Sequence, residues 1–109
     1  MAYDTTLASR VRDVLGEHPE IAEREMFGGI AFLLSGNMAV GVSKDDLMVR
    51  IDPDEHDEAL AAPGVRAFDM TGRPMRGWIL VAPEATAEVS DLQRWVEIGL
   101  AFAGTLPAK

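Results

Sequence analysis

Cysteine is absent from the 109 residues of this chain. Its absence excludes disulfide bonds, thiolate zinc sites, iron–sulfur clusters and cysteine nucleophiles, and it fits a protein kept in a reducing compartment. Histidine is scarce as well, with only His18 and His56. These two lie far apart, without the i, i+4 spacing of a helical ligand pair, so we expect both on the surface and no metal site.

Long apolar runs are also missing. No stretch approaches the ~18–20 apolar residues that span a bilayer, and Met1–Asp4 lacks the basic and apolar regions of a signal peptide. We therefore expect a cytoplasmic protein that does not use a membrane. A chain of this length, 48% hydrophobic and 26% charged, can bury a core, so residues 1–109 are predicted to form a single domain.

Positive charge is in short supply. The chain has 10 basic and 18 acidic residues, which gives a net charge of −8. Such a surface repels a phosphate backbone on average, so direct nucleic-acid binding is not expected. The densest acidic run, Asp52–Glu58, lacks the twelve-residue pattern and central glycine of a calcium loop, and we interpret it as the solvated start of a helix.

The sequence also lacks the motifs of common catalytic and cofactor sites. No serine lies in a G-x-S-x-G elbow or an S-x-x-K pair, and neither the dinucleotide fingerprint nor the P-loop occurs. We therefore predict no catalytic residues, no cofactor and no enzymatic activity. An enzyme such as a methyltransferase is the weakest interpretation, since nothing supplies the glycine-rich turn of a cofactor cleft.

What the sequence does contain is an apolar, glycine-punctuated stretch, Arg24–Val42, that turns at Ser35-Gly36-Asn37. Turn residues between two apolar runs predict a hairpin at the centre of an antiparallel sheet. Short apolar or alternating runs predict further strands. The expected strands are Ile21–Met26, Ile30–Leu34, Met38–Val42, Leu47–Ile51, Val65–Asp69 and Trp78–Val81. Trp78, Trp95 and the methionines are assigned to the core.

Three segments have the apolar periodicity and end signals of helices. The first, Asp4–Leu15, has Asp4 or Thr5 as its cap and Gly16 at its end. The second starts at Asp52 and stops at Pro63-Gly64, and the third runs from a capping box at Ser90 to about Leu106. The predicted fold is α+β: a two-layer domain in which a central antiparallel sheet, a β-meander plus one or two further strands, is flanked by three helices.

One basic group offers a candidate site. Arg73 and Arg76 lie in a predicted loop, Thr71–Gly77, and Arg50 ends the meander strand. Guanidinium groups that converge beside the amides of Gly28-Gly29 would hold a carboxylate or a phosphate. The alternative is that these arginines pair with the protein's own acids, such as Asp69 or Glu25, and that the glycines only satisfy backbone geometry.

Four separated blocks of this sequence resemble the TfoX (Sxy) N-terminal domain family. They are Arg24–Phe32, Gly36–Met38, Asp46–Arg50 and Thr71–Trp78, and the similarity extends from about Arg10 to Leu106. The resemblance implies a two-layer α+β fold and a bacterial cytoplasmic protein. It also implies co-regulation of transcription in natural competence rather than catalysis.

The family has no established catalytic residues, so none is assigned here. The blocks contain the candidate binding positions Phe27, Gly28, Gly29, Arg50, Arg73 and Arg76. Full-length competence regulators carry a second, helical domain and this chain ends at Lys109, so we expect a stand-alone relative. The leading hypothesis is a regulatory protein-interaction domain that forms a homodimer and contacts protein partners whose identity the sequence does not give. The alternative is a domain that binds a small anion or other small ligand through the arginine and glycine cluster.

Overall fold

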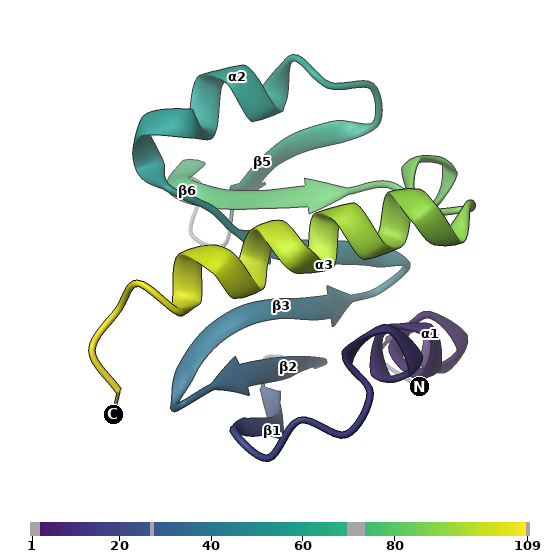
Figure 1. Ribbon diagram of the computed structural model, residues 1–109. Coiled ribbons are helices and arrows are strands. Elements are labelled where there is room, and N and C mark those ends of the chain that lie inside the picture. Colours follow the sequence, from purple (N-terminus) through teal and green to yellow (C-terminus); the bar gives the residue numbers. More distant parts are fainter. Residues whose placement is uncertain (1–2, 27, 70–73, 109) are drawn as a thin grey trace.

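The computed structural model describes residues 3–26, 28–69 and 74–108. Within these ranges the chain forms a six-stranded sheet, three α-helices and two short 3₁₀ turns (Figure 1). In chain order the elements are α1 (Thr5–Leu15), β1 (Ile21–Met26), β2 (Gly29–Leu34), β3 (Asn37–Ser43), β4 (Asp46–Arg50), η1 (Pro53–Glu55), α2 (His56–Leu60), β5 (Val65–Asp69), β6 (Pro74–Val81), η2 (Pro83–Ala85) and α3 (Val89–Ala103).

The sheet has the strand order β1-β2-β3-β4-β6-β5, and every neighbouring pair is antiparallel. The first four strands form the predicted meander. The hairpin between β2 and β3 turns at Ser35 and Gly36, which both have positive φ angles of 50° and 86°. Two such residues make the turn whose twist matches the strands it joins. The predicted hairpin and antiparallel sheet are therefore confirmed.

The helices and the sheet share one apolar core. Strand residues at alternate positions pack against the buried stripes of α1 and α3, because side chains on a strand alternate between its two faces. In Figure 1, α3 crosses the sheet over β3, α2 lies beside β5 and β6, and α1 lies beside α3 near the end of β3. The two-layer α+β prediction is confirmed. The core cluster is Leu7, Ala8, Val11, Ile30, Phe32, Val40, Val42, Leu47, Val49, Ile51, Ile79, Val81, Leu92, Trp95 and Val96.

Two helix starts follow the prediction. Asp4 caps α1, and its Oδ1 accepts hydrogen bonds from the backbone N–H groups of Thr6 (2.9 Å) and Leu7 (3.1 Å). Asp52 caps the turn before α2 in the same way, through the N–H of Asp54 (2.9 Å). Each carboxylate accepts hydrogen bonds from backbone amides that have no partner inside the helix. Its negative charge is also attracted to the positive end of the helix dipole.

The predicted start of α3 is wrong. The helix begins at Val89, so Ser90 lies inside it, and Glu88 occupies the cap position without a side-chain hydrogen bond. A tertiary contact holds this entry instead: Arg10 Nη2 donates to the carbonyl oxygens of Thr86 (2.7 Å) and Ala87 (3.2 Å). The helix ends at Ala103, earlier than predicted.

The glycine- and proline-marked segment before Trp78 is also different from the prediction. Pro74–Gly77 belongs to β6 rather than to a loop. Proline is tolerated as the first residue of a strand, and Pro74 pairs with Asp69 of β5. Gly77 has a positive φ of 92° and its carbonyl accepts a hydrogen bond from the N–H of Ile51 (2.8 Å).

His18 is exposed as predicted, but the prediction for His56 is wrong. His56 is 4% exposed, and its Nδ1 accepts a hydrogen bond from the N–H of Gly77 (3.1 Å). The reason is position, because His56 is the first residue of α2 and this helix packs on β6. The imidazole thus serves as a buried structural acceptor.

Candidate functional site

The described members of the predicted arginine and glycine cluster do not converge. Because neighbouring strands are antiparallel, the start of β2 at Gly29 lies at the end of the sheet where β3 and β6 finish. Arg50 closes β4 at the opposite end, where β6 begins. Two other candidates, Phe27 and Arg73, lie outside the described residues.

The glycines are explained by backbone geometry. A Cβ atom on Gly29 would lie 2.4 Å from the carbonyl oxygen of Val42, closer than real contacts allow. Gly28 has a φ of 76°, in the left-handed region that favours glycine. The connection between β1 and β2 therefore needs glycine at both positions for its backbone geometry alone.

The two described arginines of the predicted cluster have different surroundings. Arg76 faces Asp57 of α2 with two N···O distances of 3.3 Å, and both side chains are largely exposed. The guanidinium of Arg50 lies 5.1 Å from the ring centre of Trp78 and 5.6 Å from that of Phe102. Arg50 is thus held by two aromatic rings, whereas Arg76 forms the acid pair that the alternative interpretation predicts.

The face of the sheet away from the core is a second surface of interest, which we call the open face. All three described helices pack on the other side, since the strand residues of the core occupy one set of alternate positions. Five large apolar side chains at the intervening positions are partly exposed and outside the core cluster. They are Leu33, Met38, Met48, Trp78 and Leu80. The prediction that Met38, Met48 and Trp78 belong to the core is therefore wrong.

A glycine, Gly41, lies on the open face in the middle of β3. A Cβ atom there would lie 2.9 Å from Cε of Met38 and 3.1 Å from Cε of Met48. The two thioether side chains therefore close over the glycine. Methionine is flexible and polarizable, and it is used at surfaces that adapt to different contacts.

Arginines surround this apolar centre. Register places Arg24 on β1, Arg50 on β4 and Arg66 on β5 at positions of the open face. Arg66 pairs with Asp46 of β4, while Arg24 and Arg50 form no ion pair with the described residues. In a chain of net charge −8, this face departs from the acidic average.

On the opposite face an ion pair joins α1 to β1. Arg12 donates from Nε and Nη2 to the two carboxylate oxygens of Glu23, both at 2.8 Å. These hydrogen bonds lower the pKa of Glu23 and raise that of Arg12. Both side chains are more than two-fifths exposed, so water screens the pair.

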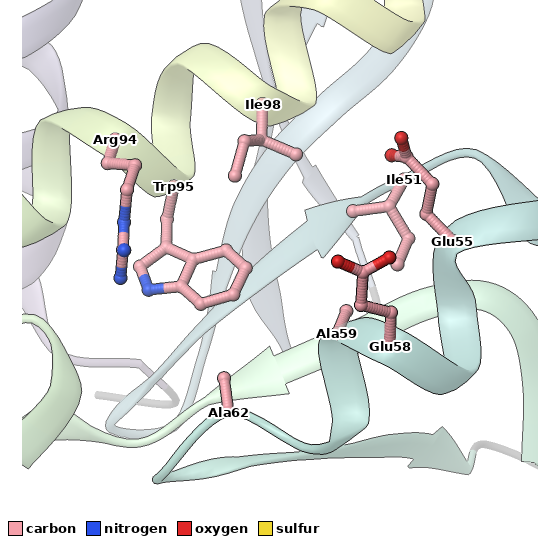
Figure 2. Close-up of a pocket in the computed structure, with 8 residues that line it drawn as sticks. All are labelled: Ile51, Glu55, Glu58, Ala59, Ala62, Arg94, Trp95 and Ile98. Carbon is pink, nitrogen blue, oxygen red and sulfur yellow. The ribbon is translucent and has the colours of Figure 1, made fainter.

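A cavity of about 400 Å³ lies between α2 and α3 (Figure 2). Its apolar side chains come from both helices and from the end of β4. Trp95 and Arg94 stand on the α3 side, and two glutamates face them from the α2 side (Figure 2). The lining residues are Ile51, Glu55, Glu58, Ala59, Ala62, Arg94, Trp95 and Ile98.

Two kinds of feature are absent from the part of the chain that the structure describes. Among residues 3–26, 28–69 and 74–108, no three histidine or acidic side chains cluster as metal ligands would. In the same ranges no helix is sufficiently long and apolar to cross a membrane.

Residues 13–103 match the family defined by the TfoX N-terminal domain. The chain belongs to this family. The open face and the cavity both fall within the matched residues, so they are features of this chain's TfoX N-terminal domain. Comparisons with curated proteins and with solved structures gave no match.

Sequence reasoning missed both surfaces for different reasons. The open face had a signal, since Met48 and Arg50 alternate with the buried residues of β4 and four other open-face positions are large and apolar. Large apolar residues are predicted to be core because most of them are buried in folded proteins. The cavity had none, because its two sides come from helices that are separated in the chain by residues 61–88.

Proposed function

We propose that this TfoX N-terminal domain is a non-enzymatic regulatory module that works through protein contacts made by the open face. The observation that carries the proposal is a sheet face with five partly exposed apolar side chains and no described helix over it. Contiguous apolar patches rimmed by polar residues are typical of interaction sites.

The composition of the open face supports this role. Aromatic residues, methionine and arginine are enriched at protein interfaces, and this face carries Trp78, Met38, Met48 and three arginines. Arg50 lies against the ring of Trp78, which orders both side chains before a partner arrives. Rigid aromatic and arginine anchors are the usual source of binding energy.

The wider role follows from the family resemblance. We propose a cytoplasmic protein that co-regulates transcription, as TfoX proteins do, and a homodimer as one form of the contact. The alternative of an anion site made by arginines and Gly28-Gly29 has less support, because those groups lie at opposite ends of the sheet.

The proposal is tested by adding a charge to the open face. Met48→Lys places an ammonium group beside Gly41, and its long aliphatic stem still covers the glycine. Gln93→Lys is the matched control, since it adds the same charge at an exposed position of α3. Sedimentation velocity measures self-association, and affinity capture from native cytosol measures other partners.

The expected result is that the wild-type chain and Gln93→Lys bind alike, while Met48→Lys binds at least tenfold more weakly. A chain that stays monomeric and retains no partner at micromolar concentration contradicts the proposal. So does an interaction that Met48→Lys leaves unchanged.

A further inference from the structure

One row of side chains crosses the whole open face and has an arginine at each end. Paired residues of antiparallel strands lie on the same side of a sheet, and neighbouring strands are about 4.8 Å apart, so a row across all six strands is about 24 Å long. The apolar centre of the open face is thus bordered by positive charge at both edges of the sheet. The row consists of Arg24 (β1), Ala31 (β2), Gly41 (β3), Met48 (β4), Leu80 (β6) and Arg66 (β5).

The arginines of the open face differ in how their charge is balanced. Arg66 pairs with Asp46, which is the one acidic residue at an open-face position of strands β1 to β4, because both glutamates of β1 lie opposite core residues. Arg24 is exposed, and neither Arg24 nor Arg50 forms an ion pair within residues 3–26, 28–69 and 74–108. Two positive charges on this face therefore lack a described counter-charge.

The guanidinium of Arg50 is positioned while its donors stay available. Its central carbon lies 5.1 Å from the ring centre of Trp78 and 5.6 Å from that of Phe102. Cation–π contacts use the charge of the group, and its N–H donors lie in its plane and can still bind an acceptor. The acceptor that fits this fork is a carboxylate, which takes two parallel hydrogen bonds. The surroundings of Arg50 therefore favour an acidic residue of a partner.

The open face offers side chains to a partner but no backbone groups. Neighbouring strands are hydrogen-bonded to one another across the whole sheet, so a segment that lies on its face must pair its own N–H and C=O groups. A helix does this and an extended segment does not. Amphipathic helices bind apolar surfaces by their apolar side, and methionine-rich surfaces suit this mode of recognition.

We propose that the open face binds an acidic amphipathic helix of a protein partner, an inference that rests on the proposed function. Arg24 shares its row with Met48, three strands away, and Arg50 lies two residues further along β4. The two arginine backbones are therefore about 16 Å apart. About eleven residues of helix, or three turns, cover this distance and return to the same side. The partner helix thus carries two carboxylates with that spacing, and its apolar stripe between them covers Met38 and Met48.

Two other occupants fit the open face less well. In a second copy of this chain the apolar stripes of α1 and α3 are buried in its own core, and its open face brings arginines to arginines. A nucleic acid is repelled by the net charge of −8. An acidic helix meets the locally positive edges and the apolar centre together.

The probe is a displayed library of random peptides of about 16 residues, selected against the wild-type chain. We expect enriched peptides to carry Asp or Glu near both ends, with apolar residues at helical spacing between them. One enriched peptide is then synthesised with its acids and with Gln in their place, and the Gln form is expected to bind at least fivefold more weakly. The chain has two tryptophans. In ¹H–¹⁵N spectra we expect the peptide to move the indole signal of Trp78 and to leave that of Trp95, which is 5% exposed.

Arginine variants test the charge by isothermal titration of the acidic peptide. Arg24→Gln is expected to lose about two- to fivefold in affinity, as at an exposed ion pair. Arg50→Gln is expected to lose roughly tenfold or more, because its hydrogen bonds to a carboxylate are charge-assisted. Arg94→Gln is the matched control, since it removes the same charge from the exposed side of α3, and we expect it to bind as the wild-type chain does. If Arg50→Gln fails to fold, Arg24→Gln and the Gln peptide still decide the question.

Several outcomes overturn the inference. They are a selection that enriches no peptide, enriched peptides without an excess of acids, and a Gln peptide that binds as tightly as its parent. Self-association that the acidic peptide does not displace, or displacement of that peptide by an oligonucleotide, assigns the face to another occupant and overturns it as well. The proposed function has a separate criterion, because it fails when Met48→Lys leaves every interaction of the chain unchanged. A neutral peptide that moves the Trp78 signal would therefore refute the acidic helix and leave the protein contact standing.

Discussion

The Nδ1 atom of His56 accepts a hydrogen bond from the backbone N–H of Gly77 at 3.1 Å, and this buried bond joins α2 to β6. Replacement of His56 by Phe leaves that N–H without a partner, so we predict a loss of about 1–3 kcal/mol in the free energy of unfolding. Urea denaturation measures it. His56→Asn keeps an acceptor near the same place and is expected to lose less. The control is His18→Phe, at an exposed residue, with an expected change within about 0.5 kcal/mol; an equal loss in both Phe variants contradicts the structural role.

Gly99 brings α3 into direct contact with β3. A Cβ atom at this position would lie 2.5 Å from the carbonyl oxygen of Ala39 and 2.7 Å from Cγ1 of Val40. We predict that Gly99→Ala pushes the helix off the sheet and destabilises the protein by about 1–3 kcal/mol, as overpacking does. Thermal and urea unfolding would measure this loss. Gly104→Ala provides the comparison, since Gly104 is exposed and has a helical φ of −67°, and we expect it to be neutral. An unfolding curve for Gly99→Ala that overlies the wild type refutes the prediction.

The Arg12–Glu23 pair gives stability a defined dependence on pH. Because the pKa of Glu23 is lowered below its ordinary value of 4.5 in the folded chain, its contribution is present above that value and is lost as pH falls through the folded pKa. The pair is exposed, so we predict that Glu23→Gln loses less than about 1 kcal/mol at pH 7. The measurement is urea unfolding of both chains from pH 7 into acid, and the difference should vanish once the pH is below the lowered pKa of Glu23 in the folded chain.

Glu25→Gln is the control for this pH series. Glu25 lies two residues further along β1, is exposed, and forms no ion pair within the described ranges. We expect it to unfold like the wild-type chain at every pH. A difference for Glu23→Gln that grows toward acid would mean that the pair acts with the opposite sign.

Arg50 and Arg76 should differ in their contribution to stability. Arg50 lies against Trp78 and Phe102, and cation–π contacts of a partly buried arginine contribute about 0.5–2 kcal/mol. Arg76 belongs to an exposed ion pair, which contributes about 0–1 kcal/mol. We predict that Arg50→Met is the more destabilising of the two, as measured by urea unfolding, and that Arg76→Met stays close to the wild type. Equal losses would show that the two rings do not hold Arg50.

Local signals in the sequence were sufficient for the sheet and for two helix starts. Ser35-Gly36 specifies a tight hairpin through its own backbone preferences, and Asp4 and Asp52 cap through bonds to amides two or three residues away. Each of these needs only neighbours in the chain. The start of α3 depends instead on Arg10, 76 and 77 residues from the carbonyls that it binds, and no local pattern contains that contact.

The arginine and glycine site was harder to predict, because whether its residues come together depends on the distances between strands. The arginine and glycine positions were found, but their convergence depended on which end of the sheet each occupies, and strand order decides this. His56 could not be placed either, since its burial comes from α2 packing on β6, where its partner Gly77 lies 21 residues later in the chain. Binding by Gly28, Gly29, Arg50 and Arg76 stays a prediction.

The two thioethers that close over Gly41 give this cysteine-free chain its own response to oxidants. Sulfoxidation would convert Met38 and Met48 from flexible apolar side chains into polar, chiral ones, and both are partly exposed at the centre of the open face. The sulfoxide oxygens would accept hydrogen bonds from water, so the apolar centre of the open face would become hydrated. Reductases convert methionine sulfoxide back to methionine. Oxidation and reduction of these two sulfur atoms would therefore make the open face more polar and then apolar again.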